Sequence, residues 1–174
     1  MQQNRFSDRN GFSLIELLTS VAVVVILTTI ASPSYLNWYQ QTRLKSAARE
    51  LALFLHRAQH LAIVSHKPVF VVFDHASPSI IRLSDAPACA MSLVCDQANE
   101  NHQLTITEPV LVVSAAFAGA TDYARFSSST GLAEGSAGAI VLRTTHYAVK
   151  IIVNQLGRIR ICAIDSVLPG VSQC

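Results

Sequence analysis

Charged side chains are scarce in this sequence. Asp, Glu, Lys and Arg make up 14% of the 174 residues, whereas hydrophobic residues make up 51%. This composition excludes an intrinsically disordered chain, which would be rich in charge and poor in apolar residues. The scarcity is greatest in residues 12–31, where Glu16 is the only ionisable side chain. The first third of the chain is this apolar run and its extension, so the remainder suffices for one globular head of about 110 residues.

Sequence motifs of enzyme active sites are also missing. There is no GxxxxGK[ST] or GxGxxG phosphate loop, no CxxC pair, and no GxSxG elbow around the serines at 127–129, which predict a turn instead. His56 and His60 are four residues apart and could face one side of a helix, but the glutamate of HExxH and a third ligand are missing. We interpret them as part of an exposed helix face. We therefore expect no catalysis, no bound metal and no cofactor.

The four cysteines all follow the apolar run, at Cys89, Cys95, Cys162 and Cys174. Four cysteines allow three pairings. We favour Cys89 with Cys95 and Cys162 with Cys174, because each pair is close in sequence and would fasten a loop or a tail. Formation of both disulfides would indicate that the head folds in an oxidising compartment.

The segment before the apolar run carries Arg5 and Arg9 against one acid, Asp8. The positive-inside rule therefore keeps this end in the cytoplasm and exports the rest. The run is longer than the apolar region of an ordinary signal peptide. Cleavage at the A-x-A-like residues 29–31 and a plain single-span anchor remain alternatives, but neither accounts for Glu16, because an acid inside a membrane span needs a partner or a function.

The hexapeptide at residues 11–16, GFSLIE, resembles the class III signal of type IV prepilins and type II secretion pseudopilins. The resemblance implies that a prepilin peptidase of the inner membrane cuts after Gly11 and methylates the new N-terminus, Phe12. It also implies that Glu16 meets the N-terminal amine of an adjacent pilin during filament assembly. Physical chemistry agrees, because an ammonium group inside an apolar zone requires a counter-charge.

The apolar run continues into an amphipathic helix. Pro33 is expected to kink or interrupt the helix. Beyond it, one apolar stripe at helical spacing is predicted to pack on the head; it consists of Leu44, Ala48, Leu51, Leu55, Ala58 and Ala62. We thus expect a leader at 1–11, a membrane and filament-core helix at 12–33, an amphipathic half at 34–64, and a periplasmic β-rich head with its tail at 65–174.

Strand-like segments follow the helix, separated by turn residues. They lie at 68–73, 80–83, 104–107, 110–116, 139–143, 147–153 and 158–163, and residues 89–101 are expected to form a surface loop. The predicted fold class is α+β. With the prepilin resemblance, this becomes the type IV pilin fold, a long N-terminal hydrophobic α-helix packed on an antiparallel β-sheet head.

The second half of the chain resembles FimT-type minor pilins and GspH-type pseudopilins, in the segment FSSSTG at 126–131 and in NQLGRIRIC at 154–162. Within the latter, GRIR resembles the GRxR motif through which FimT-type pilins bind DNA. Alternation in a strand puts Arg158 and Arg160 on one face, where each guanidinium can contact a phosphate, and Gly157 allows a tight turn. Lys150 and Arg143 could extend the patch, since residues 135–164 contain no acid.

The leading hypothesis is a minor type IV pilin that captures double-stranded DNA without sequence preference for natural transformation. It would be a single-pass inner-membrane protein with a periplasmic head, later assembled with other major and minor pilins into an extracellular pilus. The alternatives are a GspH-like minor pseudopilin of a type II secretion system and a minor pilin that primes pilus assembly. Two exposed arginines on a strand are also common on solvated faces or protected edges.

Overall fold

The computed structural model describes residues 13–74, 78–86, 102–119, 122–164 and 167–174, with the side chains of residues 30–33 also left out. The chain divides into two compact units, Met1–Trp38 and Tyr39–Cys174. Cys89, Cys95 and the loop expected at 89–101 lie outside the described residues, as do Gly11 and Phe12.

One helix, α1, runs from Leu14 to Ser65. It bends between Thr29 and Ser34, the region in which Pro33 is expected to kink the helix. Its first part is apolar on every side, with large side chains such as Leu17 and Val24 more than half exposed. The few hydroxyl groups bond within the helix, as Thr28 does to the carbonyl of Val25 at 2.9 Å, which satisfies them without a partner from outside. Within the described residues, neither part of α1 on its own side of the bend meets the length and hydropathy criteria for a membrane span. Leu14–Thr29 and Ser34–Ser65 meet these criteria only when they are taken together.

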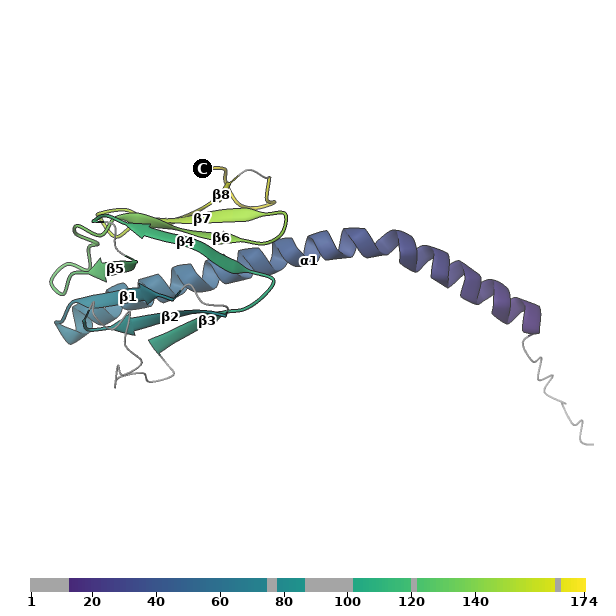
Figure 1. Cartoon of the computed structure of the whole chain (residues 1–174), viewed down its shortest axis with the longest axis horizontal. Helices are drawn as coiled ribbons and strands as arrows, with labels where there is room; N and C mark the ends of the chain where they lie inside the picture. Colours follow the sequence, from purple (N-terminus) through teal and green to yellow (C-terminus); the bar gives the residue numbers. More distant parts are fainter. Residues whose placement is uncertain (1–12, 75–77, 87–101, 120–121, 165–166) are drawn as a thin grey trace, which may run out of the picture. The chain divides into compact units, whose positions relative to one another are not determined.

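The second half of α1 packs on the head through the apolar stripe that its sequence predicts. All six members of the stripe have exposed fractions of 0–1%. They join one core cluster with apolar residues of both β-sheets, and Figure 1 shows the helix running alongside these sheets. Full burial of a leucine side chain such as Leu51 or Leu55 contributes about 1.5 to 3 kcal/mol to the stability of the head.

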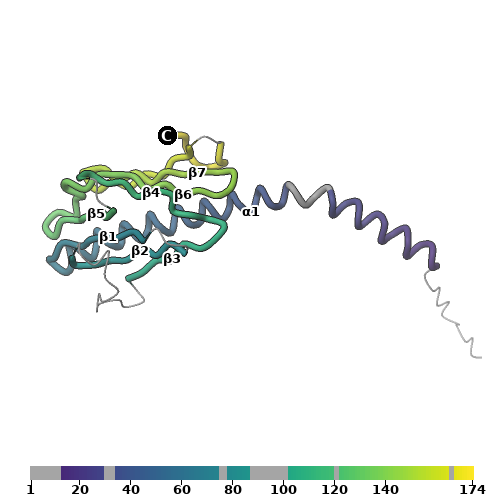
Figure 2. Tube along the Cα trace, in the orientation of Figure 1, coloured from purple at the N-terminus to yellow at the C-terminus, as the bar shows by residue number. Residues whose placement is uncertain are grey.

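The head has two four-stranded antiparallel sheets rather than one. The first has the order β3-β2-β1-β5 and contains β1 (Val69–Phe73), β2 (Ser79–Ser84), β3 (Gln103–Ile106) and β5 (Tyr123–Phe126). The second has the order β4-β6-β7-β8 and contains β4 (Leu111–Phe117), β6 (Gly138–Arg143), β7 (Ala148–Val153) and β8 (Ile159–Ile164). The trace in Figure 2 passes from β3 to β4, returns to β5 and then enters β6, β7 and β8. Seven of these eight strands match predicted segments, and the fold is the predicted one, a long helix on an antiparallel β head.

A turn joins β5 to the segment that leads to β6, as expected for the serine run. The amide of Gly131 donates to the carbonyl of Ser127 at 2.9 Å, and the amide of Ser127 in turn donates to the carbonyl of Leu132. Gly131 has φ of +68°, a conformation that glycine adopts without steric cost. The turn therefore brings Gly131 against the last turns of α1, where a side chain at this position would meet Ile63.

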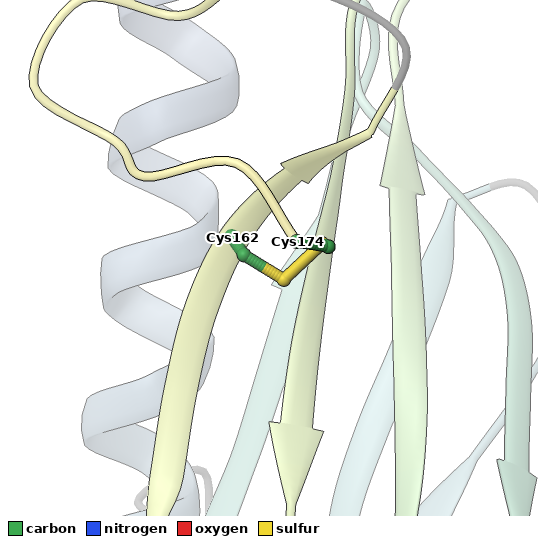
Figure 3. Close-up of a disulfide and its surroundings, with 2 residues drawn as sticks. All are labelled: Cys162 and Cys174. Atoms are coloured by element: carbon green, nitrogen blue, oxygen red, sulfur yellow. A yellow bond between two sulfur atoms is a disulfide. The ribbon is translucent and has the colours of Figure 1, made fainter.

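The C-terminal tail is fastened to the outer edge of β8. Cys162 and Cys174 form the predicted disulfide, with 5.0 Å between their Cα atoms (Figure 3). Beside it, the amide of Ala163 donates to the carbonyl of Ser172 at 2.8 Å, and the amide of Cys174 donates to the carbonyl of Ala163 at 3.1 Å. Farther along the tail, Lys45 of α1 donates to the carbonyl of Pro169. The tail thus closes part of a sheet edge that would otherwise present unpaired backbone groups.

Candidate nucleic-acid interface

The strand register places three basic side chains on one face of the second sheet. Arg143 of β6 lies opposite Ala148, and Lys150 follows two residues later on β7. Lys150 lies opposite Cys162, and Arg160 precedes Cys162 by two residues on β8. Because side chains directly opposite or two residues apart share a face, these three basic residues do so. They form a diagonal across three neighbouring strands.

Arg158 extends this diagonal, although it does not lie in a strand as predicted. β8 begins one residue later, at Ile159, and Arg158 ends the turn between β7 and β8. The backbone pairing nevertheless continues, because the amide of Asn154 donates to the carbonyl of Arg158 at 3.1 Å. We call Arg143, Lys150, Arg160 and Arg158 the basic diagonal. By ordinary sheet geometry, the Cα atoms of neighbouring members that lie within the strands are ~7 to 8 Å apart.

The other face of the same strands is the core of the head. It presents Ile140, Leu142, Val149, Ile151 and Val153, each with an exposed fraction of 0–1%. The basic diagonal therefore lies on the outer face, with Arg143, Arg158 and Arg160 exposed and Lys150 half-buried. Residues 135–164, all of which the structure describes, include no acidic side chain. Nothing on these strands opposes the positive field of the diagonal.

The turn that carries Arg158 is held from within. The amide of Gly157 donates to the carbonyl of Asn154 at 2.9 Å, and the side chain of Asn154 accepts from the amide of Arg158 at 2.7 Å. Gly157 itself is buried, with φ of +72°. The turn is thus specified by Asn154 and Gly157, and it leaves Leu156 at its tip 74% exposed.

The helix also holds this turn. The side-chain amide of Gln59 donates to the carbonyl of Gly157, and its oxygen lies 2.9 Å from Nδ1 of His56, from which it accepts a hydrogen bond. A side chain at Gly157 would meet this amide and the carbonyl of Gly131. Three segments distant in sequence therefore meet at Gly157. Sequence reasoning missed Gln59; an asparagine at a turn is a signal that could have found Asn154.

This contact also bears on the histidine pair. His56 is bonded to Gln59, and the described residues contain no group of three His, Cys, Asp or Glu side chains arranged to hold a metal ion. At the start of α1, Glu16 lies in the first turn, where its carbonyl accepts from the hydroxyl of Thr19 at 3.0 Å.

The arrangement suits contacts with phosphate groups. Guanidinium groups donate to phosphate oxygens through two parallel hydrogen bonds, and an ammonium group binds as a compact point charge. The diagonal places three guanidinium groups and one ammonium group along a line over the outer face of the second sheet and its β7–β8 turn. Such a line can follow a polyanionic backbone, and it reads no base sequence by itself.

Comparisons with known proteins are consistent with this architecture. Residues 47–157 match the family described as type II transport protein GspH, and residues 6–32 match the prokaryotic N-terminal methylation motif. No curated protein sequence is significantly similar to the chain.

Two solved structures share the fold. The type IV minor pilin FimU of Pseudomonas aeruginosa is 15% identical, with a TM-score of 0.52 over 74% of this chain and 98% of that protein. The minor pseudopilin EpsH of the type 2 secretion system of Vibrio cholerae is also 15% identical, with a TM-score of 0.51 over 71% of this chain and 99% of that protein.

Proposed function

The chain belongs to the type II transport protein GspH family, and we propose that it is a FimT-type minor type IV pilin that binds extracellular DNA and supports natural transformation. The observation that carries this proposal is the basic diagonal, four cations on one outer face of a sheet whose strands β6, β7 and β8 contain no acid. The resemblance of residues 157–160 to the GRxR motif supports the same assignment. The proposed role is binding and assembly, with no reaction catalysed.

Binding through the diagonal has predictable properties. Each cation that neutralises a phosphate releases a condensed counterion, so affinity falls steeply as the salt concentration rises. Contacts limited to phosphates give little preference for any base sequence. The affinity of one subunit is weak with four such contacts, and several copies or neighbouring pilins in a filament raise the overall avidity.

The N-terminal segment contains the residues proposed for processing, membrane anchoring and filament assembly. The methylation motif at 6–32 supports cleavage by a prepilin peptidase after Gly11 and methylation of Phe12. Before assembly, the apolar part of α1 anchors the chain in the inner membrane with the head in the periplasm. In the filament, Glu16 contacts the N-terminal amine of a neighbouring pilin and sets the axial register.

A second candidate is a minor pseudopilin of a type II secretion system. The description of the family favours it, and the likeness to EpsH is nearly equal to the likeness to FimU. In that role the head contacts other pseudopilins, and the basic diagonal has no DNA to bind.

Charge reversal of the turn separates the two candidates in the native host. The variant Arg158→Glu with Arg160→Glu is compared with a matched control, Lys67→Glu with Arg125→Glu, which makes the same change at two exposed positions in or next to the first sheet. The proposal expects the first variant to lose transformation while pili and protein secretion persist, and the control to retain all three. Lost secretion with unchanged transformation would favour the pseudopilin. Lost pili in the first variant alone would favour a priming role.

A further inference from the structure

The apolar part of α1 ends in a cluster of aromatic residues. After Glu16 the next charged side chain is Arg43, so residues 17–42 carry none. The twenty residues 12–31 are by themselves long enough, as an α-helix, to match the ~30 Å hydrocarbon core of a bilayer, so the residues that follow them fall at the level of the headgroup layer. Tyr35, Trp38 and Tyr39 stand at the far end of the stretch.

Tyr35 and Trp38 contact each other at the end of the first unit, and Tyr39 contacts Arg43 at the start of the second. The rings of Tyr35 and Trp38 are 6.0 Å apart between centroids, and both side chains are about three-fifths exposed, at 61% and 59%. The guanidinium carbon of Arg43 lies 5.3 Å from the centroid of the Tyr39 ring, and Nε of Arg43 donates to the Tyr39 hydroxyl at 3.1 Å. Lys45 and Arg49 follow Arg43 along the helix.

We propose that Tyr35 and Trp38 form an interfacial belt that binds the headgroup layer of a phospholipid bilayer on the exported side. The inference rests on the membrane anchoring in the proposed function and adds the depth at which the unassembled subunit is held. Tyrosine and tryptophan concentrate at membrane interfaces because each has an apolar ring and a polar tip.

A lipid occupant is favoured over a second copy of the chain by the surface that precedes the belt. Large side chains on every side of the helix between Leu14 and Leu27 are more than half exposed. A helix that is apolar all round suits a continuous apolar solvent, whereas a single protein partner requires only one apolar stripe. The belt therefore ends a segment whose whole circumference suits acyl chains.

The belt can be tested by fluorescence, since Trp38 is the only tryptophan in the chain. The full chain is reconstituted into vesicles of phosphatidylcholine and phosphatidylglycerol with phosphatidylcholine brominated near the headgroup or near the bilayer centre. The belt predicts a blue shift of Trp38 emission and quenching roughly twofold stronger by the shallow bromines than by the deep ones. Absent quenching, or stronger quenching by the deep bromines, would overturn it.

Two variants calibrate the depth scale. Trp38→Phe with Val24→Trp moves the probe into the apolar run and is expected to be quenched best by the deep bromines. Trp38→Phe with Leu53→Trp moves it to an exposed position on the amphipathic half, where neither lipid is expected to quench it. Replacement of Tyr35, as Tyr35→Ser, should reduce the preference of Trp38 for the shallow bromines. An unchanged preference would show that Tyr35 does not belong to the belt.

Two further measurements on the same reconstituted protein, its flotation with vesicles and its DNA binding, distinguish failure of the belt from failure of the proposed function. A chain that does not float with vesicles contradicts both the membrane anchoring and the belt. A chain that floats and binds DNA, but whose Trp38 is not quenched, contradicts the belt alone. The measurement is repeated at high dilution in lipid, where subunits are kept apart, and a Trp38 that stays unquenched there overturns the proposal.

Discussion

The side-chain amide of Gln59 donates a hydrogen bond to the backbone carbonyl of Gly157, 98 residues farther along the chain. Gly157 immediately precedes Arg158, so this bond joins the amphipathic half of α1 to the turn that presents the arginines. The same turn is fixed from within by the side chain of Asn154, which accepts from the amide of Arg158. The position of Arg158 is therefore set by the packing of the head as well as by local turn chemistry.

Gln59→Leu tests this link. Leucine keeps the approximate size of the side chain but donates nothing, so we expect a loss of about 1 kcal/mol in stability and a severalfold loss of DNA affinity. Gln41→Leu is the matched control, because Gln41 donates to the Tyr147 hydroxyl at 2.8 Å away from the turn. It should lose similar stability and keep its DNA affinity. Equal DNA affinities for the two variants would show that Gln59 does not position the turn.

Gly157→Ala tests the close packing at the turn. A methyl group there would meet the amide of Gln59 and the carbonyl of Gly131, at a φ that costs a non-glycine residue roughly 1 to 2 kcal/mol. Gly135→Ala is the control, since its φ is +69° and nothing lies near its added methyl. Urea unfolding should show a larger loss of stability for Gly157→Ala. Equal losses of stability in the two variants would mean that the Gln59 side chain moves away from the added methyl group at no cost in free energy.

Much of the fold follows from the sequence, because burial patterns repeat with the period of the element. The stripe from Leu44 to Ala62 has helical spacing, and the strands of the second sheet alternate between core and surface. β5 was missed because Arg125 interrupts its four residues, whereas β3, which is equally short, was predicted. Division of the strands into two sheets could not be predicted, since pairing depends on contacts between distant segments.

The candidate site was predicted in its residues but not in its geometry. GRIR identifies Arg158 and Arg160, whereas the face taken by Arg143 and Lys150 depends on strand register. A slip of one residue would have turned either side chain toward the core. Gln59 carries no sequence signal, because a glutamine on a half-buried helix face is ordinary until its partner is known.

Removal of the disulfide should loosen the tail. Cys162→Ser with Cys174→Ser removes a cross-link between residues 12 apart, and we expect a loss of about 2 to 4 kcal/mol in the free energy of unfolding. The urea midpoint of the variant, compared with that of the native head in the presence and absence of a reductant, measures this loss. A reductant that lowers the midpoint of the native head by more than that of the variant, which retains Cys89 and Cys95, supports the assignment; equal midpoints for the native head and the variant without reductant would contradict it.

Glu16→Ala should block entry into the filament without affecting the head, because an N-terminal amine of a neighbouring subunit then lacks its counter-charge. Immunoblots of sheared pili and of membranes measure this, with Gly11→Ala as the control that blocks processing instead. We expect processed Glu16→Ala protein in the membrane and little in the pili. Normal recovery of Glu16→Ala in pili would show that the carboxylate is not required for assembly.

The central claim is that the basic diagonal binds DNA, and a salt titration tests it most directly. The head, residues 34–174, is titrated with random-sequence duplex DNA alongside two folded variants, Arg158→Glu with Arg160→Glu and the control Lys67→Glu with Arg125→Glu. We predict that the native head and the control bind DNA less tightly as salt rises, with a steep dependence. The first variant should bind far more weakly, and its log-log slope should be smaller in magnitude by about 0.9 for each phosphate that is no longer neutralised. A native head that binds no DNA at low salt, or that binds as well after reversal of both arginines, would contradict the claim.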